Sequence, residues 1–258
     1  MTPKQPLLFI GHGSPMNAIE DTQYTREWQR IGKTLGTPRA LLMISAHWIT
    51  EGETRIATAE HPEMIYDMYG FPEELYQVDY PTSGSAAIAN EILALFSAFP
   101  IQSDSERGFD HGVWSVLVHL FPEHNIPVIA LSLDYDQPPE WHYEFGKILR
   151  MLREQGILII ASGNTVHNLS KVSFGSPVSY DWAREFDERI QKGVREKNYE
   201  DIVDFRSWGT ISKLAHPTYD HLLPLIVALG AVRQEDSVAF FAQGIDLGSV
   251  AMTSMIWK

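Results

Sequence analysis

The sequence predicts an α/β fold: a central, mostly parallel or mixed β-sheet with helices on both faces. Short runs of consecutive apolar residues recur along the chain, and such runs are typical of central strands that are covered on both faces. Longer amphipathic stretches lie between them, and this alternation is the pattern of a layered α/β domain. No internal repeat, low-complexity tract or linker interrupts it, so we interpret residues 1–258 as one domain.

Six apolar runs are the candidate strands. Four of them are continuous and rich in Leu, Ile, Val or Phe: residues 7–10 (LLFI), 40–44 (ALLMI), 127–133 (PVIALSL) and 157–161 (ILIIA). The two weaker runs, 238–241 and 250–256, lie near the C-terminus. The four stronger runs are therefore expected to form the centre of the sheet.

Five amphipathic stretches are the candidate helices, because their apolar residues recur at helical spacing. They are residues 24–35, 86–96, 113–121, 141–154 and 181–197. One further segment fits neither pattern, since residues 61–85 are rich in Pro, Gly, Tyr and acidic residues. We expect this segment to be a long ordered loop over the sheet edge, a candidate lid.

Composition narrows the possible functions. The chain has no cysteine, so disulfides, cysteine nucleophiles and thiolate metal sites are excluded. With 20 Lys and Arg against 33 Asp and Glu, the net charge is −13, and such a surface repels nucleic acid and anionic membranes. The longest apolar stretch, 222–232, falls far short of the roughly 20 residues of a membrane span. We therefore expect a cytoplasmic protein without nucleic-acid or membrane partners; the oligomeric state is not indicated.

Histidines follow three of the candidate strands near the point where each strand ends. His12 lies in GHGSP after the first strand, His47 in SAHW after the second, and His167 in SGNTVHN after the strand at 157–161. In an open α/β sheet, ligands bind beyond the carboxyl ends of the strands. If these strands are neighbours, the three histidines share one crevice. Histidine is the commonest metal ligand, so the pattern favours a shared metal site over three unrelated structural histidines.

A fourth candidate, His221, lies in the segment HPTYDHLLP. Pro217 suits the first turn of a helix, which would put His221 near a helix N-terminus. One interpretation is a capped, buried helix, since the residues after His221 are strongly apolar. The other is a further metal ligand, with Asp220 as the carboxylate that competes for that role.

A fifth candidate, His111, lies in GFDHGVW, where Asp110 is a plausible N-cap for the helix that follows. The positive end of the helix dipole keeps an imidazole neutral at that position, and a substrate oxygen could be held there. Capping alone explains Asp110 equally well, so both interpretations stay open.

Other catalytic motifs are incomplete or absent. Gly11-x-Gly13 is followed by Met16 where a dinucleotide fingerprint has its third glycine. No GxxxxGK[ST], GxSxG or HExxH occurs in the chain.

Taken in order, the histidine motifs resemble those of the class III (LigB-type) extradiol ring-cleavage dioxygenases, and most closely the 4,5-DOPA extradiol dioxygenase branch. The motifs span nearly the whole chain in the expected order. They are GHGSPMNA at 11–18, SAHW at 45–48, GFDHGVW at 108–114, SGNTVHNL at 162–169 and HPTYDHLLPL at 216–225.

The resemblance implies a mononuclear non-haem metal site on an α/β fold. It implies His12, His47 and His221 as metal ligands, His167 as an acid/base histidine beside them, and His111 as a substrate contact. Some sites of this type also count the histidine at the position of His167 as a ligand. The expected metal for activity is Fe²⁺, although a histidine site without thiolates also binds Zn²⁺.

The implied reaction inserts O2 into the ring of a catechol, DOPA-like substrate and gives a yellow semialdehyde. Four aromatic side chains could wall the ring: Trp48, Tyr66, Tyr69 and Phe71. Two alternatives from other classes use the same histidines: a zinc-dependent hydrolase that activates water, and a catalytically silent metal-binding protein. Oxygen uptake in the presence of a catechol separates the first reaction from both.

Overall fold

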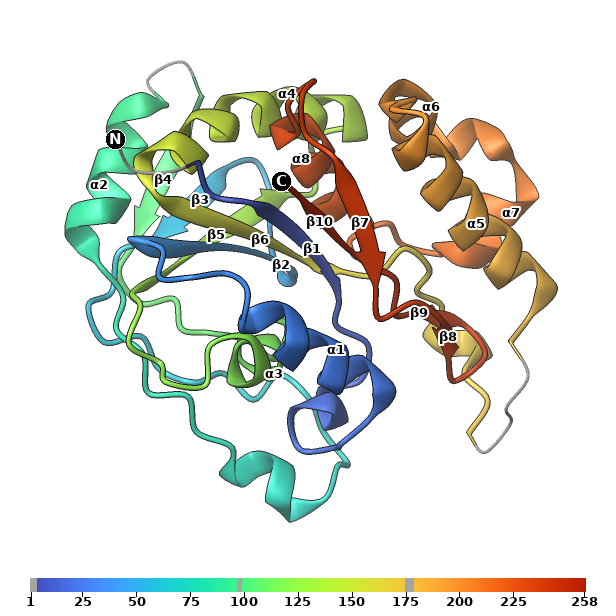
Figure 1. Ribbon diagram of the computed structural model, residues 1–258, viewed down its shortest axis with the longest axis horizontal. Coiled ribbons are helices and arrows are strands. Elements are labelled where there is room, and N and C mark those ends of the chain that lie inside the picture. Colours follow the sequence, from blue (N-terminus) through green and yellow to red (C-terminus); the bar gives the residue numbers. More distant parts are fainter. Residues whose placement is uncertain (1–3, 97–98, 175–178) are drawn as a thin grey trace.

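The four strongest apolar runs form the parallel centre of a mixed sheet in the computed structural model, which describes residues 4–96, 99–174 and 179–258 (Figure 1). These strands are β1 (Leu7–Gly11), β2 (Ala40–Thr50), β5 (Val128–Asp134) and β6 (Ile157–Gly163). Their order across the sheet is β5-β2-β6-β1, and every neighbouring pair is parallel. The three strands that precede the histidines are thus adjacent, and their carboxyl ends meet at one end of the sheet.

Four more strands extend the sheet, giving the order β4-β3-β5-β2-β6-β1-β10-β7 among the described residues. On one side β3 (Thr54–Ala57) pairs antiparallel with β5 and parallel with β4 (Ile101–Asp104), and on the other side β10 pairs antiparallel with both β1 and β7. The weaker C-terminal runs are confirmed as strands: 238–241 is β7 (Val238–Phe241), and 250–256 divides into β9 (Val250–Ala251) and β10 (Ser254–Trp257). Strand β9 leaves the main sheet and pairs with β8 (Ile245–Asp246). Strands β3, β4 and β8 were not predicted from the sequence, because each has too few apolar residues to form a run.

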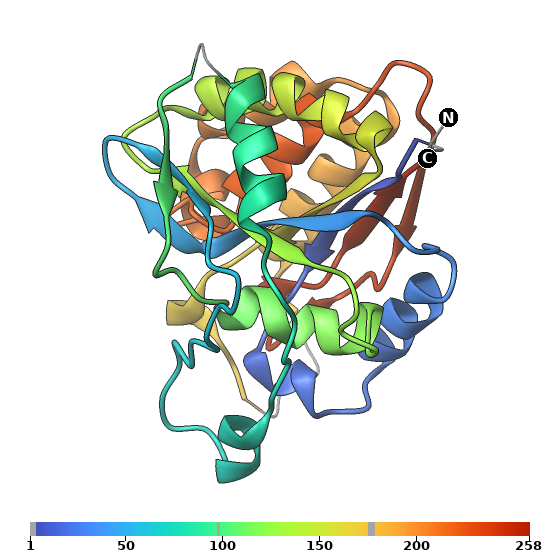
Figure 2. The same ribbon diagram turned by 90° about the vertical axis from the view of Figure 1, so that its left-hand side faces the viewer.

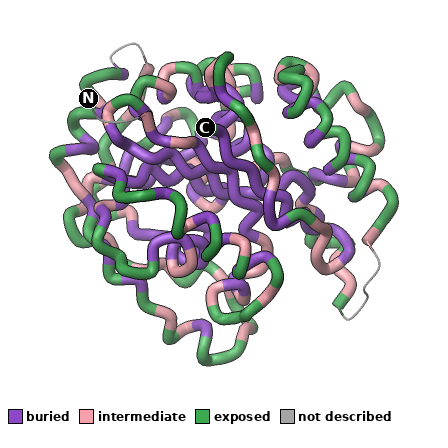
Figure 3. The backbone as a smooth tube through the Cα atoms, in the orientation of Figure 1, coloured by how far each residue is buried: buried purple, intermediate pink, exposed green. Residues whose placement is uncertain are grey.

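Alternate side chains of the central strands enter two separate cores, one on each face of the sheet. Helices lie on both faces of the sheet (Figure 2), and the central strands are coloured as buried (Figure 3). Leu7 and Phe9 pack in the first core, whereas Leu8 and Ile10 pack in the second. The first core is covered by α2 (Ala86–Leu95), α4 (Pro139–Leu149), α5 (Asp181–Arg195) and α8 (Leu223–Ala231). The second is covered by α1 (Gln23–Gly32) and α3 (His111–Leu120). The predicted α/β architecture with helices on both faces is therefore confirmed.

All five predicted helices are present, as α1 to α5. The predicted stretch 141–154 continues beyond α4 as a 3₁₀ helix over Arg150–Gln155. Two α-helices among the described residues were missed, α6 (Tyr199–Val203) and α7 (Thr210–Ala215), whereas α8 is the buried helix that was expected after His221. The first two are very short, and every residue of α8 is buried, so α8 has no polar face and no amphipathic period.

The start of α8 differs from the expectation. Pro217 does not lie in its first turn, because the helix begins at Leu223 and Pro224 occupies that turn instead. His221 nevertheless lies just before the helix, next to its N-cap residue Leu222.

The segment 61–85 is largely irregular, as expected, with one 3₁₀ helix over Glu73–Gln77. It is anchored beside α3, because Ile65 N–H donates to the Phe109 carbonyl (2.7 Å) and Phe109 N–H donates to the Glu63 carbonyl (2.8 Å). This anchoring brings the residues that follow Ile65 to the carboxyl end of the sheet. Among the described residues, no helix is long and apolar enough to cross a membrane.

Candidate metal centre and active site

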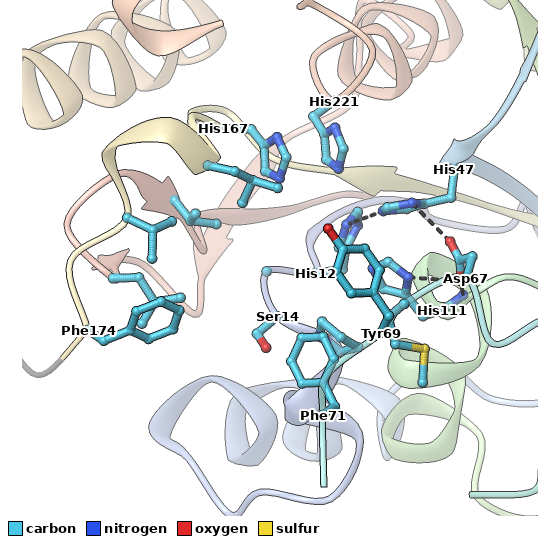
Figure 4. Close-up of a pocket in the computed structure, with 17 residues that line it drawn as sticks. His12, Ser14, His47, Asp67, Tyr69, Phe71, His111, His167, Phe174 and His221 are labelled. Carbon is cyan, nitrogen blue, oxygen red and sulfur yellow. Dashed lines mark hydrogen bonds and ion pairs between the residues drawn. The ribbon is translucent and has the colours of Figure 1, made fainter. Parts of the chain in front are cut away.

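All five candidate histidines converge at the carboxyl end of the parallel strands, although they come from five different segments (Figure 4). His12 directly follows β1, His47 lies near the end of β2, and His167 follows β6. His111 is the first residue of α3, and His221 precedes α8. The ring centroids of His12, His47 and His221 are 5.0–5.4 Å apart.

Local backbone geometry lets these segments approach. Strand β2 shifts its register against β5 between Ile44 and Ile49, an irregularity that includes His47 and re-aims its side chain. Gly13 turns the chain after His12 with φ +63°, and a Cβ there would lie 2.4 Å from Met252 Sδ. At the end of β6, a Cβ on Gly163 would lie 2.3 Å from the carbonyl oxygen of His221. The small residues beside the histidines are thus required by close packing.

Hydrogen bonding holds His12 in one tautomer. Its Nδ1 lies 3.0 Å from Ser162 Oγ, and this hydroxyl donates its hydrogen to the Gly112 carbonyl (2.6 Å). A hydroxyl has one hydrogen, so Ser162 must accept from Nδ1–H of His12. Burial, reinforced by the neighbouring His47, lowers the pKa of His12 well below its ordinary value and keeps the ring neutral. Its Nε2 therefore carries a lone pair, as a metal ligand requires.

Carboxylates hold the Nδ1 atoms of the other two histidines. Asp67 Oδ2 lies 3.1 Å from Nδ1 of His47, and Asp220 Oδ2 pairs with Nδ1 of His221. A carboxylate only accepts, so both Nδ1 atoms donate and both Nε2 atoms are left free. Burial, with the nearby His167, lowers the pKa of His221 well below its ordinary value. Nε2 of His221 is buried without any hydrogen-bond partner.

The three Nε2 atoms fit a metal ion. Those of His12 and His47 are only 3.2 Å apart, and the ligand atoms of His12, His47 and His221 all lie within 4.8 Å of one another. Lone pairs that face one another repel, and a cation between them turns the repulsion into bonding. Imidazole suits iron and zinc, and hydrogen-bonded Nδ1 atoms are the usual support of metal-binding histidines.

Two overlapping groups also have ligand spacing, namely His47 with Asp67 and His111, and His167 with Asp220 and His221. In each of them the carboxylate is already engaged by a ring Nδ1. These groups therefore resemble the surroundings of a metal centre more than the centre itself.

Asp67 is the functional residue that the sequence analysis missed. Its two oxygens join two candidate site residues, because Oδ2 pairs with His47 while Oδ1 accepts from Nδ1 (3.0 Å) and the backbone N–H (2.9 Å) of His111. Burial alone would raise the pKa of Asp67, but the hydrogen bonds from His111 and His47 outweigh it and hold the pKa below the ordinary value. Asp67 lies in an irregular loop and belongs to no motif. Its only indication in the sequence was the predicted position of the segment 61–85 over the sheet edge.

Asp110 occupies the N-cap position of α3, as predicted, but its side chain makes no capping hydrogen bond. It accepts from Ser45 Oγ (2.6 Å) and from Arg107 Nη2 (2.5 Å) instead. Arg107 also donates to the carbonyl of His47 (3.3 Å). This buried network ties the end of β2 to the start of α3 and fixes the backbones of His47 and His111 relative to each other.

His111 and His167 line the pocket beside the three-histidine group. Nδ1 of His111 donates to Asp67, which leaves its Nε2 as an acceptor, and burial lowers the pKa of His111 so that the ring is neutral. His167 stacks on His221 with ring centroids 3.5 Å apart and an interplanar angle of 8°. Burial lowers the pKa of His167 to about 3. Both rings are therefore neutral at pH 7.

The histidines form the floor of a pocket of about 460 Å³. Of the four aromatic residues expected to wall it, Tyr69 and Phe71 line the pocket, whereas Trp48 and Tyr66 do not. Trp48 is buried beneath the guanidinium of Arg107, and the Tyr66 hydroxyl donates to the carbonyl of Val78 (2.7 Å). A pocket of this size accommodates a substituted aromatic ring.

Comparisons with known proteins identify the family of this chain. Residues 6–246 match the family model described as the catalytic LigB subunit of aromatic ring-opening dioxygenase. The 4,5-DOPA dioxygenase extradiol of Escherichia coli (strain K12) is 42% identical over 260 residues, covering 98% of this chain and 94% of that protein. The protein of the same name from Beta vulgaris is 34% identical over 95% of this chain and 94% of its own length.

A crystal structure of an uncharacterized protein from Escherichia coli K12 matches with a TM-score of 0.85 and 37% identity, covering 98% of this chain and 99% of that one. The resemblance seen in the sequence motifs is thereby confirmed. The chain belongs to the LigB family of aromatic ring-opening dioxygenases.

Proposed function

We propose that this chain is an iron(II)-dependent extradiol dioxygenase, which uses O2 to open the ring of a catechol beside its two hydroxyls and gives a semialdehyde. The observation that carries the proposal is the set of three Nε2 lone pairs that face one point on the floor of an aromatic-sized pocket. The names of the relatives make 3,4-dihydroxyphenylalanine (DOPA) the first catechol to test.

In this proposal His12, His47 and His221 hold the metal through Nε2, and Ser162, Asp67 and Asp220 orient them through Nδ1. If iron(II) were held by these three histidines, it would supply a site for the catechol and the redox chemistry that activates O2.

The two remaining histidines act on the substrate. Nε2 of His111 is a free acceptor because Asp67 holds its Nδ1, so it can take a hydrogen bond from a catechol hydroxyl and orient the ring. His167 is neutral and lines the same pocket, so it can accept a proton from the substrate and return it after ring opening. Stacking on His221 keeps the His167 ring at the edge of the metal centre.

The identity of the metal decides whether the protein is active. Zn²⁺ ranks above Fe²⁺ in affinity for nitrogen ligands, so zinc can occupy the site. Zinc has no accessible redox change and should be inert toward O2.

We also propose that residues 1–258 form one catalytic domain that acts in the cytoplasm. Its only substrates in this proposal are a small catechol and O2.

The test is to strip the metal with a chelator and reload the protein anaerobically with iron(II) or zinc(II). Oxygen uptake and the yellow product are then measured with DOPA and with unsubstituted catechol. We expect the iron form to consume one O2 per catechol and the zinc form to consume none. The control variant is His61→Ala, which alters an exposed histidine outside the pocket. Equal cleavage by the zinc form would contradict the proposal. Ester or amide hydrolysis without O2 would favour a zinc hydrolase, and metal binding without either reaction would favour a catalytically silent protein.

A further inference from the structure

Asp187 is a buried carboxylate outside the histidine pocket, on the buried side of α5. It is only 5% exposed, and no lysine or arginine among the described residues pairs with it. Neutral groups surround it instead: Oδ1 accepts from Thr165 Oγ1 (2.5 Å), and Oδ2 accepts from Thr253 Oγ1 (2.8 Å) and Gln191 Nε2 (2.8 Å). Burial raises the pKa of Asp187, and these hydrogen bonds oppose the rise. An apolar side chain would fill this position at less cost, so we expect the carboxylate to have a further role.

His167 is the site histidine whose ring is held least directly. Each of the other four site histidines has a hydroxyl or carboxylate partner at Nδ1. In the described parts of the chain, no group hydrogen-bonds to the ring of His167, which stacks on His221 (Figure 4). The position of this ring therefore depends mainly on the backbone that carries it.

Thr165 fixes that backbone two residues before His167. Its side chain is bound by Asp187, and its carbonyl accepts from Nε2 of His216 (2.8 Å). Thr165 has no exposed surface, so water cannot replace either partner. Further along, the backbone N–H of His167 donates to the carbonyl of Ala215 (2.9 Å). The segment between β6 and His167 is thus held at Thr165 by two side chains from other parts of the fold.

We propose that Asp187 is a positioning residue for the acid/base step: through Thr165 it holds the backbone that keeps the His167 ring in the pocket and directed at the substrate. The proposal rests on the proposed function, since it assumes that His167 acts on the catechol. An anchor on a helix holds a functional side chain more precisely than a loop does by itself. A displacement of about 1 Å can cost on the order of 10²-fold in rate. Loss of the hydrogen bond between Asp187 and Thr165 should therefore lower turnover more than substrate binding.

Substitutions at Thr165 and Gln191 separate positioning from stability. Thr165→Val removes the hydroxyl at nearly the same volume, and Thr165→Ser restores it. Gln191→Met removes a different hydrogen bond to the same carboxylate, and both partners of that bond lie on α5. We expect Thr165→Val and Gln191→Met to lower the urea midpoint by similar amounts, because each leaves a buried acceptor without one donor. Only Thr165→Val should lower kcat, by about 10–100-fold, with an unchanged KM for catechol and one iron per chain. Thr165→Ser should recover most of the lost turnover.

A double-mutant cycle tests Asp187 itself. Asp187→Ala should lower kcat about as much as Thr165→Val, and the double variant should lose no more than either single variant, because all three remove the same interaction. Additive losses would mean that the two residues act independently, and would overturn the proposal. If Asp187→Ala does not fold, the comparison of Thr165→Val with Thr165→Ser and Gln191→Met decides the question.

The position of the His167 ring can also be observed without turnover, by NMR of the metal-free protein. The ring is stacked 3.5 Å from His221, so its Hε1 proton experiences the ring current of that imidazole, and its signal is the one missing from His167→Gln. We expect this signal to move in Thr165→Val and to stay in place in Gln191→Met.

Three results for Thr165→Val would overturn the proposal: an unmoved signal, an unchanged kcat, or the loss of iron together with kcat. An equal loss of kcat in Gln191→Met would do the same, because it would attribute the effect to stability. If the wild-type enzyme loaded with iron opens no catechol, the proposed function fails, whereas the NMR comparison still tests whether Asp187 and Thr165 place the ring.

Discussion

Two clusters of ionisable side chains lie at opposite ends of the central strands, and they are built in opposite ways. At the amino ends of β1 and β6, opposite charges meet: Asp236 accepts from Arg153 Nη1 (2.5 Å) and from Lys4 Nζ (2.6 Å), and Arg153 and Asp236 have no exposed side-chain surface. At the carboxyl ends, like groups meet, since three imidazoles turn their lone pairs toward one another.

This difference indicates a separate role for each cluster. The charges of the ion pair are balanced within the protein, so its contribution is to stability, and it contributes only while both partners are present. Under the proposed function, the histidine cluster is complete only with a cation from outside the chain. Ser162, Asp67 and Asp220 hold the three imidazoles in an arrangement that lowers the stability of the metal-free protein. Such a cost is typical of a binding site. Substitutions in the two clusters should therefore have separable consequences.

The largest expected effect is on metal affinity. His221→Ala should lower the affinity for iron(II) by at least about a thousandfold, because a three-ligand site loses several kcal/mol with one ligand. Anaerobic titration with iron(II) and metal analysis per chain would measure this, with His61→Ala as the control. Full occupancy and unchanged affinity in His221→Ala would exclude it as a ligand and make Asp220 the next candidate.

The next effect is on turnover alone. His167→Ala should lose roughly 10²–10⁴-fold in kcat, the usual contribution of a general acid/base, and should keep one metal per chain. Steady-state kinetics and metal analysis on the same samples would test this. If metal and activity are lost together, His167 is a ligand; if kcat is unchanged, its role is structural.

The ion-pair cluster should respond in stability instead. Asp236→Asn leaves Arg153 buried without its counter-charge, and we expect a loss of about 3–5 kcal/mol in the free energy of unfolding. The folded protein should still bind one metal per chain.

Asp220→Asn is the matched substitution in the histidine cluster. It should cost less stability, because the side chain of Asp220 is 21% exposed, but it should weaken metal binding about 10–100-fold. Urea denaturation gives the free energy of unfolding of Asp236→Asn and Asp220→Asn, and iron(II) titration gives the metal affinity of each. If both variants lose the same property, the contrast between the clusters is wrong.

A further effect separates the two clusters by pH. Buried His216, beside the histidine cluster, donates from Nε2 to the Thr165 carbonyl (2.8 Å), and burial lowers its pKa to about 4. Between pH 6.5 and about 4, His216 is protonated in the unfolded chain but not in the folded chain. The free energy of unfolding therefore decreases as the pH falls through this range. His216 alone contributes on the order of 3 kcal/mol to this loss.

For Asp236, burial alone would raise the pKa, but hydrogen bonds from Arg153 and Lys4 outweigh it and lower the pKa to about 2. Its contribution is therefore present at and above pH 4 and is lost only between about pH 4 and 2. Urea denaturation of the metal-free protein at pH 7, 5.5 and 4.5 should show a steady decline in the free energy of unfolding, and Asp236→Asn should show the same slope. A flat profile over this range would contradict the assignment.

The central strands and their histidines could be predicted from the sequence because local patterns encode both. Leu7 to Ile10 is apolar on both faces, and His12 follows at once. By contrast, β3 and β4 form through pairing with partners that are distant in the sequence, and the IQSD of β4 has no apolar pattern of its own. Asp67 was missed for the same reason, since its role depends on where the anchored loop crosses α3.

The most direct test of the account is an anomalous-diffraction measurement on crystals of the protein loaded anaerobically with iron(II). We expect one iron per chain, about 2 Å from each Nε2 of His12, His47 and His221, with Asp67 and Asp220 still bound to the Nδ1 atoms of His47 and His221. An iron peak between Asp67 and His111, or one bound by Asp220 in place of His221, would contradict it.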